Sequence, residues 1–443
     1  MPGKVALQTL GCKLNFSETS TIGNQFRNSG YEIVDFSENA DVYVFNTCSV
    51  TENAEKECRQ LVRRALRKNP NAFVVVTGCY AQLRPDEIAR IEGVDAVLGS
   101  KEKLKLFSLI ENFEKRNLAC IFVSPTQDLN EFGKAHSSDA DTRTRAYFKI
   151  QDGCDYKCSF CTIPLARGRS RSMNPADLIS EFKSLVNSGY KEIILTGVNV
   201  GDYGNSFKIN MYDVLVKMIE VPGDFRIRIS SIEPNLLTDE IINLTLQNEK
   251  MCKHFHIPLQ SGSSKILKLM QRRYNAKDYS NLIYKIKERI PDAGIGVDVI
   301  VGFPGESNKD FLDTHDFLMN LPISYLHVFT YSERPYTKAI DMENTVDVFE
   351  RKKRNNILRL LSEKKKLLFY QSMIGKKLRV LFESGNDDNT IKGFSSNYIR
   401  VNNKFDPLLC NEFTDIEIHS VSPEGLAEGK IKGIQKSIEL IAS

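Results

Sequence analysis

The first part of the chain repeats one pattern, in which a short apolar run precedes a longer stretch with helical spacing of its apolar residues. The apolar runs are 5–10, 41–46 and 73–77, and the helix-like stretches are 17–28, 53–68 and 84–91. Strands that alternate with helices are typical of a parallel sheet with right-handed crossovers. The pattern therefore predicts an α/β domain over residues 1–125.

A second alternation extends over residues 144–371. The predicted strands are 147–151, 192–196, 226–230, 253–258, 294–302 and 325–331, and the helices are 175–187, 211–219, 239–246, 263–270, 276–289 and 309–318. A closed barrel of this type needs eight repeats, so this pattern predicts a partial (β/α)6 barrel with its site at the carboxyl ends of the strands. The polar segment 126–143 between the two alternations predicts a linker or a mobile connection.

The last part of the chain changes character. Short strand-like runs at 378–383, 390–394, 398–401 and 413–419 are separated by Gly, Asn, Asp and Pro. They predict a small antiparallel β-barrel over residues 372–440. Such barrels often bind oligonucleotides, and Phe394 and Tyr398 are expected to be available for base stacking.

Positive charge is concentrated just before this barrel. The helix-like stretch 350–370 is rich in Lys and Arg, and Lys376 and Lys377 extend it. This segment is expected to bind a phosphate backbone. The alternative is an ordinary solvated helix face.

The composition narrows the class of protein. With 443 residues, 41% hydrophobic and 26% charged, the chain is long enough for two or three globular domains. Its net charge of +4 means that affinity for nucleic acid must come from local clusters of charge. No apolar run approaches the ~20 residues of a membrane span and the N-terminus does not resemble a signal peptide, so a cytoplasmic protein without membrane contact is expected. Ten cysteines in such a protein indicate metal or redox chemistry rather than disulfides.

The most informative motif holds three cysteines directly after the strand predicted at 147–151. Cys154, Cys158 and Cys161 have the spacing CxxxCxxC. Iron–sulfur clusters are usually held by four thiolates, so three leave one iron open to another ligand. The alternative is a zinc site or buried thiols. A structural zinc ion is usually bound by four protein ligands from CxxC pairs, and this motif lacks the second pair.

A second set of three cysteines is distributed over the N-terminal domain. Cys12, Cys48 and Cys79 each follow one of its predicted strands. Because the carboxyl ends of parallel strands lie at one edge of a sheet, these cysteines are expected to converge and to hold a second cluster with an open iron. The alternative is that they pack behind the strands, as Cys58 and Cys120 are expected to do.

Loops after the barrel strands carry glycines and hydrogen-bonding side chains at 196–199, 230–234, 256–262 and 302–306. Together they predict a cofactor pocket, although each alone could be an ordinary βα turn. Of His254 and His256, one is expected in the core and the other at the pocket edge, with a metal-binding pair as the alternative, while Asp298 could lie in the core or in the pocket.

Three arginines follow the cysteine loop closely, at Arg167, Arg169 and Arg171. Guanidinium groups beside a site for an anionic substrate predict contacts with phosphate or carboxylate. A solvated loop is the alternative.

Taken together, these motifs resemble the methylthiotransferase family of radical S-adenosylmethionine (SAM) enzymes, over the whole chain. The resemblance implies two 4Fe–4S clusters, an auxiliary one at Cys12, Cys48 and Cys79 and a SAM-binding one at Cys154, Cys158 and Cys161. It also implies a C-terminal TRAM barrel that binds tRNA. The SAM contacts that it implies are Thr196, Gly197, Asn199, Ser231, Glu233, Val301, Gly302, Phe303 and Pro304. No acid–base catalyst is expected, because the chemistry takes place at the clusters.

The segment Gly11-Cys12-Lys13-Leu14-Asn15 is similar to that of the MtaB branch, which acts on threonylcarbamoyl-adenosine in tRNA. The resemblance implies 2-methylthiolation of this nucleoside at position 37, by a monomer that receives electrons from an external donor. The segment 329–337 departs from the usual family pattern of Phe-Pro-Tyr-Ser and Arg-Glu-Gly-Thr. Methylthiolation of isopentenyl-adenosine or of a ribosomal-protein aspartate remains an alternative. An iron–sulfur electron carrier and an RNA-binding protein whose cysteines bind zinc are further alternatives.

Overall fold

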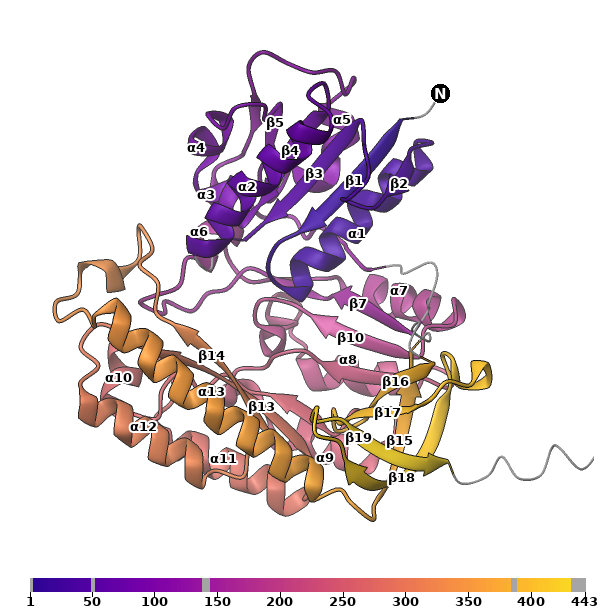
Figure 1. The fold of residues 1–443 in the computed structure, drawn as a ribbon, viewed down its shortest axis with the longest axis vertical. Helices are drawn as coiled ribbons and strands as arrows, with labels where there is room; N and C mark the ends of the chain where they lie inside the picture. The colour runs from indigo at the N-terminus through magenta and orange to yellow at the C-terminus, as the bar shows by residue number, and fades with distance from the viewer. Residues whose placement is uncertain (1–2, 49–51, 138–143, 384–388, 432–443) are drawn as a thin grey trace, which may run out of the picture.

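The computed structural model describes residues 3–48, 52–137, 144–383 and 389–431. In Figure 1 an N-terminal α/β unit lies beside a central half-open barrel, and a small β-barrel packs against the other end of that central unit. None of the described helices combines the length and the apolar character that a membrane span requires.

The N-terminal unit is a parallel sheet with helices on both faces. Within the described ranges it has six strands in the order β2-β1-β3-β4-β5-β6. Their bounds are β1 Lys4–Thr9, β2 Glu32–Val34, β3 Val42–Thr47, β4 Phe73–Gly78, β5 Ala96–Leu98 and β6 Cys120–Phe122. Helices α1 (Lys13–Asn28) and α5 (Leu106–Leu109) pack on one face, and α2 (Glu52–Lys68), α3 (Cys79–Leu83) and α4 (Pro85–Ala89) on the other. Strands β3 and β4 are buried along their whole length, as the centre of a parallel sheet requires.

Three details differ from the expectations for this unit. Strands β2, β5 and β6 were not predicted, because runs of three residues give no clear periodicity. The helix predicted at 84–91 corresponds to α4, which is shorter, and it is preceded by α3, which was not predicted. Arg84 separates the two helices, because the residue before a proline disfavours helical backbone. Cys58 is buried in the core as expected, but Cys120 is only half-buried on edge strand β6.

The central unit contains the six strands predicted from the sequence. Among the described residues they form two parallel three-stranded sheets, β11-β10-β7 and β12-β13-β14, which a parallel bridge joins between Ile227 and Met251. The strands are β7 Arg145–Lys149, β10 Glu192–Thr196, β11 Arg226–Ile229, β12 His254–His256, β13 Gly294–Val301 and β14 Tyr325–Thr330. The helices are α6 Ile163–Arg167, α7 Pro175–Asn187, α8 Met211–Ile219, α9 Asp239–Gln247, α10 Ser264–Leu269, α11 Ala276–Arg289 and α12 Asn308–Asn320. The short strands β8 (Gln151–Asp152) and β9 (Arg171–Ser172) pair beside the cysteine loop.

The described part of the predicted linker is ordered against β7. The backbone N–H of Ser137 donates to Tyr147 O at 2.9 Å, and that of Lys149 donates to Ala135 O at 3.0 Å. Residues 135–137 therefore pair with the edge of β7, and residues 138–143 lie outside the described ranges.

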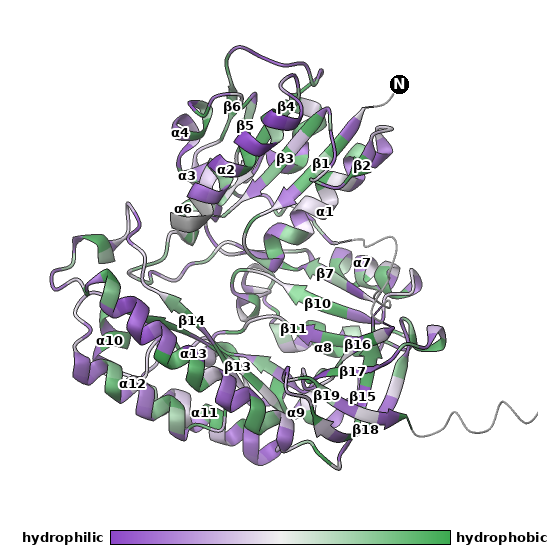
Figure 2. Ribbon diagram, viewed as in Figure 1, coloured by the Kyte–Doolittle hydropathy of each residue, from purple (hydrophilic) through white to green (hydrophobic). Residues whose placement is uncertain are grey.

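Helix α13 (Val348–Gln371) packs along the edge strand β14 and leads to the C-terminal barrel. Figure 2 shows hydrophilic residues recurring along α13, whereas β10 and β13 are mostly hydrophobic. The described residues after α13 close into the predicted small barrel in the order β15-β16-β17-β19-β18. Its strands are β15 Lys377–Phe382, β16 Thr390–Ser395, β17 Arg400–Lys404, β18 Phe413–Val421 and β19 Ala427–Ile431.

The two aromatic residues expected to stack on RNA have another role. Tyr398 lies in a turn with φ of 72°, so the strand predicted at 398–401 begins only at Arg400. The ring of Tyr398 stacks on Phe394 at 4.6 Å, and the guanidinium of Arg228 lies 4.5 Å from its centroid. The expectation of free stacking platforms is wrong, because these rings join the small barrel to the floor of the central unit.

Candidate functional site

The loop with Cys154, Cys158 and Cys161 begins at the carboxyl end of β8, at the mouth of the central barrel. The three thiols are partly buried. Burial raises the pKa of Cys154 and of Cys161 to about 12. Thiols in this environment ionise when a metal takes the place of the proton, so the loop is suited to ligate metal and not to act as an acid–base group.

Arg272, which the sequence reasoning missed, connects this loop to the predicted cofactor pocket. Its Nη1 lies 3.1 Å from Cys158 Sγ, and its Nη2 pairs with the carboxylate of Glu233. This places Glu233 beside the cysteine loop. No sequence pattern around Arg272 could have found it, because the contact joins residues that are far apart in the chain.

The segment after β10 has buried polar atoms without partners. Among the described residues, neither the hydroxyl oxygen of Thr196 nor the amide atoms of Asn199 have a hydrogen-bond partner, although both side chains are buried. Gln151 Oε1 accepts hydrogen bonds of 2.9 Å from the backbone N–H groups of Val198 and Asn199 and holds the turn in place. Buried polar groups are rarely left unpaired, so this turn fits a polar ligand such as the amino-acid part of SAM.

The other predicted pocket residues lie on the neighbouring loops. Val301 and Phe303 are buried, and the ring of Phe303 meets that of Phe160 from the cysteine loop at 6.4 Å. Gly302 has a φ of 76° and donates its backbone N–H to Glu306 at 2.9 Å. Ser231 follows β11 and is partly buried, Pro304 is buried, and Gly197 lies against Gln151. These positions surround the same barrel mouth.

The second set of cysteines lies at the carboxyl edge of the N-terminal sheet. Cys12 caps the start of α1, Cys48 follows β3 and Cys79 begins α3 after β4. A Cβ at Gly11, whose φ is 105°, would lie 2.7 Å from Cys48 Cβ, so the loops that carry Cys12 and Cys48 touch each other. Cys79 raises the pKa of Cys12 electrostatically, which brings the third thiol into the same region. The chemistry of this donor set fits an iron–sulfur cluster.

Cys12 is solvent-accessible, yet desolvation by surrounding protein raises the pKa of its thiol. Arg167 acts in the opposite direction. Together these features describe a residue at the base of a concave opening and not one on a convex surface.

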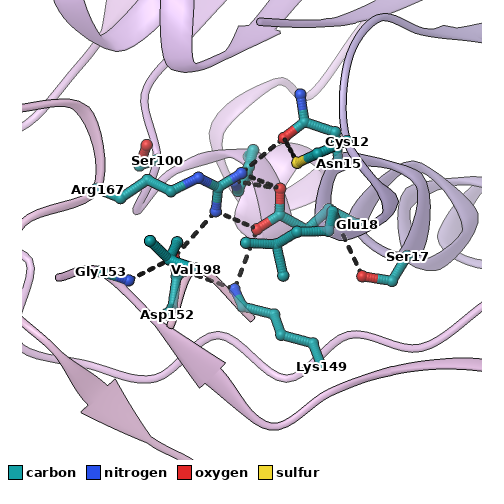
Figure 3. Close-up of polar contacts among 12 residues, drawn as sticks. Cys12, Asn15, Ser17, Glu18, Ser100, Lys149, Asp152, Gly153, Arg167 and Val198 are labelled. Atoms are coloured by element: carbon teal, nitrogen blue, oxygen red, sulfur yellow. Dashed lines mark hydrogen bonds and ion pairs between the residues drawn. The ribbon is translucent and has the colours of Figure 1, made fainter. Parts of the chain in front are cut away.

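A buried ion network lies between the two sets of cysteines (Figure 3). Glu18 of α1 pairs with Lys103 at 2.6 Å, with Lys149 at 3.0 Å and with Arg167 at 3.0 Å. Arg167 also pairs with Asp152 at 3.0 Å, and its Nη2 donates to Asn15 Oδ1 at 2.6 Å. The network therefore ties the helix that begins beside Cys12 to the strand that leads to Cys154.

Sequence reasoning missed Glu18, although a signal was present. Glu18 stands on the i, i+4 row of Leu14, Ile22 and Phe26, all of which are buried on one face of α1. A carboxylate within a buried stripe needs a cationic partner, and the structure supplies three. Arg167, expected to contact substrate, is one of these partners and is only 1% exposed.

The other predicted substrate contacts are more accessible. The side chain of Arg169 is 91% exposed and that of Lys377 is 60% exposed. Arg171 is largely buried and donates to Arg167 O and Arg169 O at 2.8 Å, which shapes the loop. Lys376 pairs with Asp292 at 2.5 Å and links the small barrel to the central unit.

The barrel lumen holds a third polar group of residues. His256 Nε2 lies 2.9 Å from Asp298 Oδ1, and the ring of His327 stacks on His256 at 5.3 Å. His254 faces the opposite end, where its Nε2 contacts Tyr325 Oη at 2.8 Å. Asp298 also lines a cavity of about 270 Å³ whose other walls include Cys161 and Thr330. Asp298 is therefore a pocket residue, His256 lies beside the pocket through its contact with Asp298, and His254 is buried in the core.

Comparisons with known proteins agree with this architecture. Residues 4–99 match the uncharacterized protein family UPF0004, and residues 148–318 match the radical SAM superfamily. The chain is 40% identical over 378 residues to the threonylcarbamoyladenosine tRNA methylthiotransferase MtaB of Aquifex aeolicus, covering 85% of this chain and 92% of that protein. It is 40% identical over 403 residues to the protein of the same name from Bacillus subtilis, covering 90% and 89%.

More distant similarities extend the comparison. The chain is 35% identical over 404 residues to the tRNA-2-methylthio-N(6)-dimethylallyladenosine synthase of Clostridium tetani, covering 88% of each. Among solved structures, the radical S-adenosylmethionine methyltransferase TsrM of Kitasatospora setae has a TM-score of 0.55 at 17% identity, over 77% of each chain. That likeness concerns the fold alone.

Proposed function

The chain belongs to the family of radical SAM tRNA methylthiotransferases, and we propose that it converts threonylcarbamoyladenosine at position 37 of tRNA to its 2-methylthio derivative. The observation that carries this proposal is the extended similarity to two relatives of that name, each 40% identical over most of the chain. Four relatives named as MtaB are 35–40% identical, and four named as tRNA-2-methylthio-N(6)-dimethylallyladenosine synthases are 33–35% identical. The motif around Lys13 favours the same substrate.

The family implies SAM and a 4Fe–4S cluster, and we assign that cluster to Cys154, Cys158 and Cys161. We assign a second 4Fe–4S cluster to Cys12, Cys48 and Cys79. When bound, these groups supply the electron that cleaves SAM and the site from which sulfur is delivered. The convergence of three strand ends at one sheet edge supports the second assignment.

The chain's own residues bind and orient the reactants. Asn199 and Thr196 offer unpaired polar atoms to the amino-acid part of SAM. Arg272 holds Glu233 beside the cysteine loop, on the side assigned to the ribose. The apolar residues Val301 and Phe303 form the wall assigned to the adenine and exclude water from the barrel mouth.

We assign tRNA binding to exposed cations around this mouth and along α13. Arg169 lies beside the cysteine loop, and Lys377 begins the small barrel. Exposed cations also recur along α13, at Lys352, Lys353, Arg359, Lys364 and Lys366. Two arginines of that helix, Arg351 and Arg354, are instead buried in contacts with Glu333 and Glu306. The proposed enzyme acts in the cytoplasm, as a monomer that takes electrons from an external donor.

Mass spectrometry of tRNA nucleosides tests the proposal. Cells that lack the protein are expected to accumulate threonylcarbamoyladenosine and to lose its 2-methylthio derivative, and the purified protein, reconstituted anaerobically, is expected to form that derivative from SAM. Loss of 2-methylthio-isopentenyladenosine instead would assign the protein to the other tRNA branch. If the 2-methylthio-threonylcarbamoyl nucleoside persisted undiminished, the proposed substrate would be wrong.

A further inference from the structure

Three side chains that can ligate metal lie together in the lumen of the central barrel. They are His256 of β12, Asp298 of β13 and His327 of β14, and one ligand atom of each lies within 4.8 Å of the other two. His256 Nε2 is 2.9 Å from Asp298 Oδ1, and the imidazole rings of His256 and His327 stack at 5.3 Å. None of the three is a cysteine ligand of the assigned clusters, and the proposed reaction gives none of them a role.

The parallel ladder places these three side chains on one face of neighbouring strands. Asp298 and His327 are direct partners in the register of β13 and β14, and His256 is the partner of Gly296, two residues before Asp298. Side chains alternate between the two faces of a strand, so positions 296 and 298 share a face. Regular strands hold their side chains more precisely than loops do, which favours a defined site.

Two features distinguish this cluster from an ordinary hydrogen-bonded pair of Asp and His. The carboxylate of Asp298 is partly buried, and within the described ranges His256 pairs with it but no Lys or Arg does within 4.0 Å. The ring of His327 contacts the rings of His256 and Tyr325, and no other described residue hydrogen-bonds to it. Carboxylates removed from water are paired with cations or coordinate metals, so a metal ion is the missing partner that fits here.

The spacing of the donor atoms suits a single ion. Two donors that each lie about 2.0–2.1 Å from one metal ion are about 2.9 Å apart at a right angle and about 3.4 Å apart at the tetrahedral angle. The distance of 2.9 Å between His256 Nε2 and Asp298 Oδ1 agrees with this range. His327 is solvent-accessible and lies on edge strand β14, so its ring is free to turn toward the other two donors.

A cavity beside the cluster gives such an ion room for additional ligands. Asp298 lines this space of about 270 Å³, and Gln260, Thr330 and Ser332 add side-chain oxygen atoms to its walls. Two imidazoles and one carboxylate with open positions are the ligand set of catalytic zinc centres and of non-haem iron centres. The cluster thus has the donors of a mononuclear site and space for an oxygen ligand.

We propose that His256, Asp298 and His327 bind one divalent first-row transition metal ion, separate from both iron–sulfur clusters, with its open positions toward the cavity. Imidazole donors select such an ion over Mg²⁺ and Ca²⁺, which take oxygen ligands. Zn²⁺ binds sites of this kind more tightly than Mn²⁺ or Fe²⁺ and is not a component of the clusters, so it is the probe. Zinc binding requires neither SAM nor tRNA, and its outcome is therefore independent of the proposed function.

Equilibrium dialysis against Zn²⁺, followed by elemental analysis, tests the site. The reconstituted protein is used, so that the clusters occupy their cysteines, and the wild type is expected to hold about one zinc per chain in addition to its iron. Asp298→Asn and His327→Gln are expected to bind zinc about 100-fold more weakly or worse at unchanged iron content, since even the partners of metal ligands contribute 10–100-fold. His315→Gln is the matched control, because His315 pairs with Asp316 at 3.1 Å but has no third donor among the described residues. It is expected to bind zinc as the wild type does.

X-ray absorption at the zinc edge identifies the donors. The wild type is expected to show nitrogen and oxygen neighbours at about 2.0–2.1 Å and no sulfur at about 2.3 Å. Sulfur neighbours would place the zinc at cysteines and would overturn the inference. So would a wild-type protein that binds no zinc, or Asp298→Asn and His327→Gln variants that bind it as tightly as the wild type. Either result would leave His256 and Asp298 as a hydrogen-bonded pair.

Discussion

Removing the charge of Glu18 tests whether the buried ion network holds the N-terminal and central units together. Glu18 is fully buried and pairs with Lys103, Lys149 and Arg167 at 2.6–3.0 Å. Glu18→Gln keeps the volume of the side chain but leaves Lys149 and Arg167 with Asp152 as their remaining carboxylate partner and Lys103 with no carboxylate partner among the described residues. Breaking a buried pair by removing one partner costs about 3–5 kcal/mol, because the other charge stays buried without compensation.

Thermal unfolding of the metal-free protein, followed by circular dichroism, measures this cost. A domain of 150–250 residues loses about 2–4 °C in Tm per kcal/mol, so Glu18→Gln is expected to lower the first transition by about 6–20 °C. Asp313→Asn is the control, because the Lys309–Asp313 pair at 2.9 Å lies on an exposed helix face and its loss should leave Tm nearly unchanged.

A double variant separates charge from packing. Lys103 is 1% exposed, so Lys103→Met removes one of the uncompensated cations while it keeps an apolar stem of similar length. Glu18→Gln with Lys103→Met is therefore expected to unfold at a higher temperature than Glu18→Gln alone. If Glu18→Gln unfolds within about 2 °C of the wild type, or if the second substitution only lowers Tm further, the network does not contribute in the way that its geometry indicates.

Three further predictions follow from the site. Chemical iron analysis of the anaerobically reconstituted protein is expected to find about eight irons per chain. The variants Cys79→Ala and Cys158→Ala are each expected to hold about four irons, because each set of three cysteines binds its own cluster. A loss of all iron in either variant would contradict two independent sites. Asn199→Ala is expected to weaken SAM binding about tenfold in equilibrium dialysis at unchanged iron content, since the buried amide of Asn199 has no other partner among the described residues; unchanged affinity would remove Asn199 from the SAM site. The pKa values of Glu18 and Glu192 are well below the ordinary value because of their cationic partners. The stability that these carboxylates contribute is therefore complete above the ordinary carboxyl pKa of about 4.3 and decreases as the pH falls toward the lowered values. Tm recorded against pH is expected to fall more gently below about pH 4.5 in Glu18→Gln than in the wild type, and parallel curves would contradict this assignment.

Local patterns predicted the architecture in outline. The alternation of apolar runs with helical stretches is a short-range property, so it located β1, β3 and β4 of the N-terminal sheet and the six strands of the central unit. The spacing of Cys154, Cys158 and Cys161 is equally local, because one loop carries all three. The position of Cys12, Cys48 and Cys79 at strand ends was enough to place them at one sheet edge, since parallel strands end on the same side.

Partners that are distant in sequence could not be found in this way. Arg167 was read as a substrate contact, but the fold surrounds it with Glu18, Asp152 and Asn15. Arg272 gave no signal at all before its contact with Cys158 was seen. Phe394 and Tyr398 are aromatic residues of the kind found on RNA-binding faces, yet the docking of the small barrel places Tyr398 against Arg228 and His254 and Phe394 against Arg145.

The sequence by itself determined the order of strands and helices and the position of the two cysteine trios in one loop and at three strand ends, because these patterns lie within short stretches of the chain. Only the tertiary structure decided which charges are buried and what they face. The cost of burying a charge depends on the groups that surround it, and those groups come together only when separate units of the chain pack. Arg167 illustrates the difference: it follows the cysteine loop in the sequence, but its guanidinium donates to Glu18 and Asn15 of the N-terminal unit.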